Sequence, residues 1–287
     1  MTSDPPLRKA DFGAIYDQPD PRAYFTTLEP FDYAIPGHGA EIVHRLLKGR
    51  ARQGTDRPRV LDVCCSYGVV ATLLKTDLAL ADVYAHYRDA SDRALTSAHL
   101  VDVDRRLLHE HRRSDSPTVV GLDVAGNAVR YALATGALDD GISENLEVDE
   151  PSTALTQMLS RLDVVVTTGG VGYVTERTFD RLLRYAPDTV WVATFCLRTY
   201  DYGPIARTLH EHGLQTERLP QTFRQRRFTG PEEREWALEQ LRERGIDPTG
   251  RETDGCYHAD FYLSRPAVEV DAQPLERLLP GHGAAPT

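Results

Sequence analysis

The chain alternates between short apolar runs typical of buried strands and amphipathic segments typical of helices. Strand-like runs stand at 59–63, 118–123, 162–168 and 189–195, and helix-like segments at 69–75, 127–135, 176–185 and 205–212. Parallel neighbours need a connection long enough to hold a helix, so this alternation predicts βαβ units and a largely parallel sheet. We therefore expect an α/β fold with a Rossmann-like, doubly wound sheet.

The last third of the chain departs from this alternation. The pattern predicts a helix over 231–244, and HADFYLS at 258–264 indicates a final strand that pairs antiparallel at an edge of the sheet. The basic run RQRR at 224–227 is interpreted as a solvated turn between a strand and that helix, with phosphate or acid binding as the alternative.

Three segments lie outside the expected sheet-and-helix core at 58–267. Residues 1–57 form a predicted cap, in which prolines and aromatics crowd the first 36 positions and a helix at 42–48 precedes a polar linker. An insertion at 76–116 contains the polar-aromatic string DVYAHYRD and a helix over 95–112, and it is either a lid or a packing extension or dimer contact. A short tail at 268–287 ends the chain.

Composition and charge narrow the functional classes. Apolar residues make up 41% of the chain, no run approaches the roughly 18 apolar residues of a membrane span, and the N-terminus lacks the apolar core of a signal peptide, so we expect a cytoplasmic protein. The formal charge of −10 disfavours nucleic acid as a partner and favours small molecules. Cys64, Cys65, Cys196 and Cys256 form neither a disulfide framework nor a zinc pattern, and no metal is expected.

The first strand-to-helix loop carries the most informative motif. Residues 60–74, VLDVCCSYGVVATLL, resemble the first motif of class I S-adenosylmethionine-dependent methyltransferases, an acid followed by G-x-G-x-G. Asp62 and Gly68 match the acid and the last glycine, whereas Cys64 and Ser66 stand at the first two glycine positions. Glycines there allow positive φ and close approach of backbone amides to a ligand. The alternative is that CCSYG forms only a tight turn.

Two further segments extend this resemblance, which covers about 58–220 together with the final strand. Residues 119–136 are similar to the second motif, and Asp123 at the end of its strand would accept the ribose hydroxyls. Residues 161–175 are similar to the fourth strand and its glycine-rich loop, which would flank the reacting methyl group or else be a flexible turn. The resemblance implies S-adenosylmethionine as cofactor. The implied cofactor-binding residues are Asp62, Cys64, Cys65, Ser66, Tyr67, Gly68, Asp123, Val124, Thr168, Gly169 and Gly170.

Methyl transfer requires alignment of the reactants and, for a poorly acidic acceptor, a base. The candidate catalytic residues are Tyr33, His38, Asp82, Tyr84, His86, Tyr87 and Tyr173. Each histidine could equally be structural, and the faces of Tyr33 and Tyr173 could attract a sulfonium or simply fill the core. The cysteine pair could supply a nucleophile near a helix N-terminus, although no partner histidine is evident.

Three functional hypotheses follow. The first is methyl transfer to a small molecule, such as a secondary metabolite. The second is an enzyme of the same fold that catalyses a cyclisation or elimination without methyl transfer. The third is a non-catalytic subunit that acts in a homodimer or with another protein. A nicotinamide site is disfavoured because the first loop lacks G-x-G-x-x-G, and no G-x-S-x-G or phosphate-loop motif supports a hydrolase or kinase.

Overall fold

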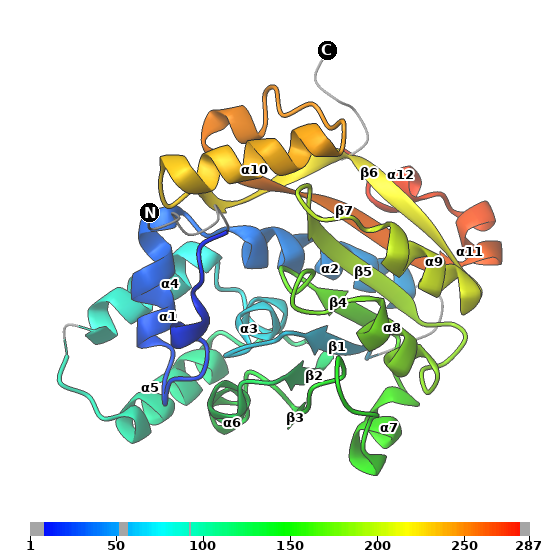
Figure 1. The fold of residues 1–287 in the computed structure, drawn as a ribbon. Coiled ribbons are helices and arrows are strands. Elements are labelled where there is room, and N and C mark those ends of the chain that lie inside the picture. The colour runs from blue at the N-terminus through cyan, green and yellow to red at the C-terminus, as the bar shows by residue number, and fades with distance from the viewer. Residues whose placement is uncertain (1–8, 52–56, 92, 282–287) are drawn as a thin grey trace.

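The computed structural model describes residues 9–51, 57–91 and 93–281. Part of the predicted linker, the start of the N-terminal cap and the end of the C-terminal tail therefore lie outside the described residues. The strands of the structure are β1 Arg59–Val63, β2 Thr118–Asp123, β3 Asp140–Ser143, β4 Val164–Thr167, β5 Trp191–Leu197, β6 Leu214–Arg227 and β7 Cys256–Pro266. They form a seven-stranded sheet in the order β3-β2-β1-β4-β5-β7-β6 (Figure 1).

Five of these strands run parallel, and the order reverses between β1 and β4, as expected for a doubly wound fold. β7 pairs antiparallel with both β5 and β6, so the predicted mostly parallel sheet with an antiparallel edge is confirmed. β7, the final strand of the described residues, is second from the edge of the sheet, because β6 forms the edge itself. The expectation that 224–227 form a solvated turn is wrong, since these residues end β6 and Arg226 is buried.

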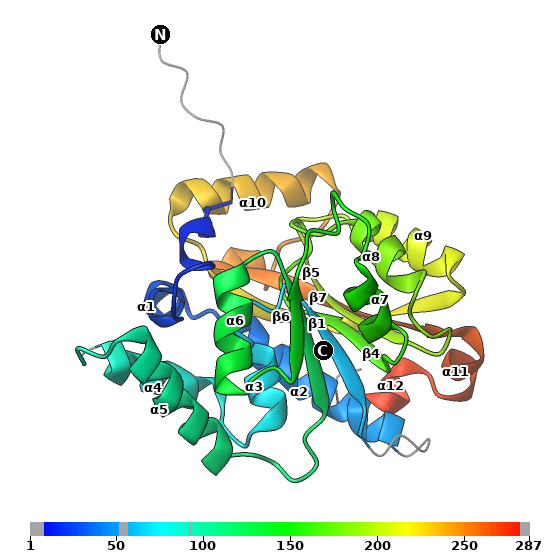
Figure 2. The same cartoon turned by 90° about the horizontal axis from the view of Figure 1, so that it is seen from below.

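Helices cover both faces of the sheet. They are α1 Arg22–Leu28, α2 Ile35–Ala51, α3 Val69–Lys75, α4 Leu80–Ser91, α5 Ser97–Glu110, α6 Gly126–Thr135, α7 Thr153–Leu159, α8 Glu176–Leu183, α9 Gly203–Glu211, α10 Pro231–Glu243, α11 Ala267–Ala272 and α12 Leu275–Leu278. Figure 2 shows α3 and α6 on one side of the sheet and α7, α8 and α9 on the other. No helix among the described residues is long and apolar enough to cross a membrane.

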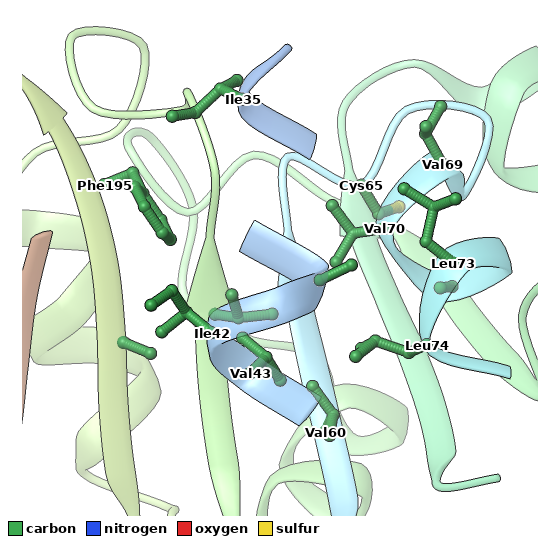
Figure 3. Close-up of a cluster of buried hydrophobic side chains, with 14 of the residues drawn as sticks. Ile35, Ile42, Val43, Val60, Cys65, Val69, Val70, Leu73, Leu74 and Phe195 are labelled. Carbon is green, nitrogen blue, oxygen red and sulfur yellow. The ribbon is translucent and has the colours of Figure 1, made fainter. Parts of the chain in front are cut away.

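One layer of the core is built where α2 and α3 lie side by side over the sheet (Figure 3). Ile42 and Val43 of α2 pack with Leu74 of α3 and Val60 of β1, all buried in one apolar cluster. The fully buried strand β4 and the alternation of β1 between the two apolar clusters are typical of a sheet covered on both faces. The rigid layer beneath α3 fixes the loop that precedes it.

The insertion at 76–116 contains two helices, α4 and α5. The polar-aromatic string at 82–89 lies within α4, which contacts α1, while α5 contacts α6. Asp104 of α5 is buried and accepts hydrogen bonds from His86 (2.7 Å), Tyr87 (2.5 Å) and Tyr131 of α6 (2.6 Å). A buried carboxylate with three donors is satisfied by this network, which holds the insertion against α6.

Candidate functional site

A cavity of about 380 Å³ opens at the carboxyl ends of β1, β2 and β4, where the strand order reverses. Its lining residues are Gly13, Tyr16, Asp17, Tyr24, Tyr33, Pro36, Asp62, Cys64, Cys65, Ser66, Val69, Val70, Asp123, Val124, Ala125, Thr168, Gly169, Gly170 and Tyr173. The lining brings together the loop after β1, the end of β2 and the loop after β4. These are the three segments that the sequence motifs singled out.

The loop after β1 keeps a backbone conformation suited to glycine, although two of its positions carry side chains. The φ angles of Cys64, Ser66 and Gly68 are 61°, 49° and 71°. Left-handed φ costs a residue with a Cβ about 1–2 kcal/mol, so the surrounding contacts must hold Cys64 and Ser66 in place. The substitution of these glycine positions therefore alters the side chains in the loop without changing its left-handed backbone.

Asp123 ties the end of β2 to that loop. Its Oδ2 accepts a hydrogen bond from the Ser66 amide at 2.8 Å, and its Oδ1 accepts one from the Ala125 amide at 2.9 Å. Each carboxylate oxygen can accept a further hydrogen bond. Asp123 is thus fixed in orientation at the cavity surface, with capacity left for the hydroxyls of a ligand.

Asp62 is the most perturbed acid of the cavity. Its side chain is 1% exposed, and its Oδ2 has no hydrogen-bond partner. Burial, together with the nearby charge of Asp123, raises the pKa of Asp62 to about 8. The Ser66 hydroxyl is also buried without a partner. Buried polar atoms normally find partners, so these two atoms leave hydrogen-bonding capacity beside the cavity.

Close packing around two glycines connects the loop after β4 to the rest of the cavity. A Cβ at Gly170 would stand 2.7 Å from the Cys64 sulfur, and a Cβ at Gly169 would stand 3.2 Å from the Tyr33 hydroxyl. Gly169 also has a φ of 143°, which favours glycine. The loop after β4 therefore packs against Tyr33 at Gly169 and against Cys64 of the β1 loop at Gly170.

The cysteine pair does not have the properties of an activated nucleophile. Burial, with a contribution from nearby carboxylates, raises the pKa values of Cys64 and Cys65 well above the ordinary range. Both thiols therefore stay protonated at neutral pH, and the thiolate is the reactive form. The structure gives no support to the nucleophile hypothesis.

Several predicted site residues lie elsewhere. Tyr67 and Gly68 end the loop after β1 but are absent from the lining, and His38 packs beside Phe223 at 5.5 Å between ring centroids. Burial lowers the pKa of His38. No described residue of the insertion lines the cavity, which favours a packing role over a lid. His86 and Tyr87 donate to Asp104 in the network described above. The Tyr84 hydroxyl donates to the Tyr33 carbonyl oxygen at 3.0 Å. The Asp82 carboxylate accepts a hydrogen bond from the Ala79 amide at the start of α4.

The sequence predicts a cap at 1–57 but, apart from Tyr33, does not single out the lining residues that this segment supplies. Gly13, Tyr16, Asp17, Tyr24 and Pro36 all face the cavity. The only signal in the sequence is the density of aromatic residues before position 36, which predicts packing but not its location. The N-terminal segment, and not the insertion, covers the site.

Tyr67 holds this cover in place. Its hydroxyl accepts a hydrogen bond from the Gln18 amide at 2.8 Å and lies 3.2 Å and 3.1 Å from the carbonyl oxygens of Ile15 and Gln18. On the other side, Asn127 of α6 donates its amide to Asp17 Oδ1 at 2.7 Å. Residues 13–18 are therefore fixed to the β1 loop and to α6.

Tyr67→Phe should loosen this cover without changing the ring that packs in the core. We expect amide hydrogen exchange over residues 13–18 to quicken by about five- to tenfold, because about 1 kcal/mol of hydrogen bonding is lost. Mass-spectrometric exchange checks this, with Tyr185→Phe as the control, because Tyr185 is an exposed tyrosine just beyond α8. Unchanged exchange in Tyr67→Phe would show that other contacts hold the segment.

Comparison with known proteins gives similarities of fold. No family model and no curated protein matches the sequence. A TehB-like SAM-dependent methyltransferase from Corynebacterium glutamicum shares 13% identity over 78% of this chain and 85% of its own, with a TM-score of 0.40. Magnesium protoporphyrin IX methyltransferase from Synechocystis with bound SAM shares 12% over 80% of both chains, TM-score 0.40. The YcgJ protein of Bacillus subtilis shares 10% over 78% and 97%, TM-score 0.44.

Proposed function

We propose that this protein binds S-adenosylmethionine and transfers its methyl group to a small molecule. The observation that carries the proposal is the unpartnered, buried Asp62 carboxyl in a cavity formed by the three motif segments. A carboxyl group that is costly to ionise when the cavity is empty gains a partner when a ligand brings an ammonium group. The motif resemblance to class I methyltransferases supports the same cofactor.

The residues present fit that cofactor. Asp62 would bind the α-ammonium of the methionine part, and the Ser66 hydroxyl would donate to its carboxylate. Asp123 would accept the ribose hydroxyls, and Val124, which is 65% exposed at the cavity, would contact the adenine. When bound, S-adenosylmethionine supplies a methyl group on a sulfonium whose departing thioether is stable.

The chain's own contribution is binding, orientation and exclusion of water. The N-terminal segment covers the cavity, while Gly169 and Gly170 pack against Tyr33 and Cys64. His38 and His86 do not line the cavity, so neither is placed to act as a base. Rate enhancement would then come mainly from holding the two reactants in line.

Calorimetric titration of the purified protein with S-adenosylmethionine and S-adenosylhomocysteine tests the proposal. We expect micromolar binding and a matching rise in thermal stability, because a ligand that binds only the native state stabilises it. Asp123→Ala should weaken binding by roughly ten- to a hundredfold, the usual effect of losing hydrogen bonds to a charged group.

Asp149→Ala is the matched control, since Asp149 is an exposed acid outside the cavity lining. Equal binding by wild type and Asp123→Ala would show that the ribose role of Asp123 is wrong. An absence of binding at millimolar ligand would overturn the proposal and favour an enzyme of this fold without methyl transfer, or a non-catalytic subunit.

A further inference from the structure

Four tyrosines, Tyr16, Tyr24, Tyr33 and Tyr173, line the cavity, and we refer to them as the tyrosine wall. The rings of Tyr16 and Tyr24 are 5.6 Å apart at an interplanar angle of 72°, and those of Tyr24 and Tyr33 are 6.3 Å apart at 85°. Rings set edge to face turn their faces in different directions. Such a wall can surround a group of atoms rather than stack on one flat ring.

The phenol groups of the wall stay neutral. Burial, followed by the interaction with Tyr33 and Tyr173, raises the pKa of Tyr16, and burial likewise raises that of Tyr33. Neither group can supply a phenolate at neutral pH. What the wall presents to a ligand is therefore aromatic faces, which carry partial negative charge, and hydroxyl groups.

The remaining charge around the cavity is also negative. Among the described lining residues, Asp17, Asp62 and Asp123 are the ionisable acids, of which Asp62 is charged at neutral pH only when a cation pairs with it, and there is no Lys, Arg or His. Arg226 lies within electrostatic reach of the wall. Its two terminal guanidinium nitrogens, however, donate to the Glu233 carboxylate at 2.9 and 2.6 Å. An anionic acceptor would thus meet carboxylates and ring faces with no cationic side chain in the lining.

A cation of the chain already lies beside the wall. The Lys9 ammonium is 5.6 Å from the centroid of Tyr173 and 5.8 Å from that of Tyr200, within the range of a cation–π interaction. Lys9 is not part of the lining. Burial and the nearby Arg226 lower the pKa of Lys9 to about 8, so the ammonium is retained at neutral pH within cation–π range of the outer ring of the wall.

We infer that the tyrosine wall binds the acceptor, and that the acceptor is an amine, held as an ammonium group before or after methylation. This inference rests on the proposed function. An amine carries its own lone pair and therefore needs no base in the lining at the moment of attack, in agreement with the positions of His38 and His86.

The reaction that follows conserves one positive charge in the cavity. A protonated amine first releases its proton to solvent. The nitrogen lone pair then forms the bond to the methyl carbon as the carbon–sulfur bond breaks, with its electron pair left on sulfur. The sulfonium becomes a neutral thioether and the nitrogen becomes the cation. Aromatic faces and carboxylates that stabilise the sulfonium before transfer stabilise the ammonium after it.

Two probes of the same shape, one cationic and one neutral, test this inference. Choline carries a trimethylammonium group, and 3,3-dimethylbutan-1-ol replaces its nitrogen with carbon. Each is titrated calorimetrically into protein saturated with S-adenosylhomocysteine, whose sulfur is neutral. We expect choline to bind about tenfold more tightly than the alcohol, the preference that a desolvated cation–π contact provides.

Variants of Tyr16 then separate the ring from the hydroxyl. Tyr16→Phe should keep the preference for choline, whereas Tyr16→Leu should reduce it by about three- to tenfold and leave binding of the alcohol unchanged. Retained affinity for S-adenosylhomocysteine shows that each variant is folded.

The outcomes distinguish the two proposals. If S-adenosylhomocysteine binds and choline shows no preference over the alcohol, the amine inference is overturned while the proposed function stands, and the wall then serves only the sulfonium. If S-adenosylhomocysteine does not bind, the proposed function fails. The same pair of probes on the free protein then decides whether the wall binds cations, and equal affinities there would overturn the inference as well.

Discussion

Asp62→Asn should make the protein more stable at alkaline pH while weakening its binding of S-adenosylmethionine. Burial and the charge of Asp123 raise the pKa of Asp62 to about 8 in the folded protein, whereas an unfolded carboxyl titrates near 3.9. Between these values the unfolded chain loses its proton first, so wild-type stability decreases as the pH rises through about 8. Asparagine removes that loss, and we expect a gain of about 2–4 kcal/mol at pH 9.

Urea unfolding of wild type and Asp62→Asn at pH 5, 7 and 9, without ligand, measures this gain. The difference should be small at pH 5 and largest at pH 9, and Asp149→Asn should show no such slope. Binding should weaken by roughly ten- to a hundredfold because the ammonium loses its carboxylate partner. A stability difference independent of pH would refute the assignment of the raised pKa to Asp62.

Glu233→Ala should destabilise the protein by about 3–5 kcal/mol, the usual cost of leaving a buried charge without its partner. Arg226 and Glu233 are 3% and 4% exposed and form a bidentate pair. Burial acts to raise the pKa of Glu233, but the hydrogen bonds and charge of Arg226 outweigh it and lower the pKa to about 2. This contribution is therefore present above about pH 4.5 and is lost as the pH falls toward 2.

Glu232→Ala is the matched control, because Glu232 is an exposed acid in the same first turn of α10. Its unfolding free energy should stay within about 0.5 kcal/mol of the wild type. Glu233 also accepts a hydrogen bond from the Ala10 amide at 2.8 Å, so its loss should speed hydrogen exchange near residue 10. Equal destabilisation by both variants would point to the loss of an acid near the N-terminus of α10 instead of the buried pair.

The sheet could be predicted because its central strands are continuous apolar runs. β1 and β2 begin and end at the residues expected, and Gly136 ends α6 in a left-handed conformation as its position indicates. β3 escaped prediction because its four residues, Asp140–Ser143, carry little apolar character. For β6 the sequence predicted only an unbounded strand before 224 and a turn in place of its end, because a proline at 220 interrupts the alternation and the last residues are basic.

The candidate site was predictable only where local motifs define it. Asp62 and Asp123 follow from strand ends and therefore lie where parallel strands meet. His86 was a reasonable candidate by chemistry, but its partner Asp104 lies 18 positions away on the next helix, and only tertiary packing brings them together. The same holds for Tyr16, whose contribution to the cavity depends on how the N-terminal segment crosses the sheet.

The contacts of the N-terminal segment also bear on the order of events during synthesis. Ala10 bonds to Glu233 across 223 positions, and the amide of Ala34 donates to the carbonyl oxygen of Gln225 in β6. The N-terminal segment must therefore wait for β6 and α10, which are synthesised about 200 residues later. Until then the β1 loop and Asp123 have no cover. The nascent chain can assemble its central strands early, but it acquires an enclosed cavity only after β6 and α10 have been synthesised.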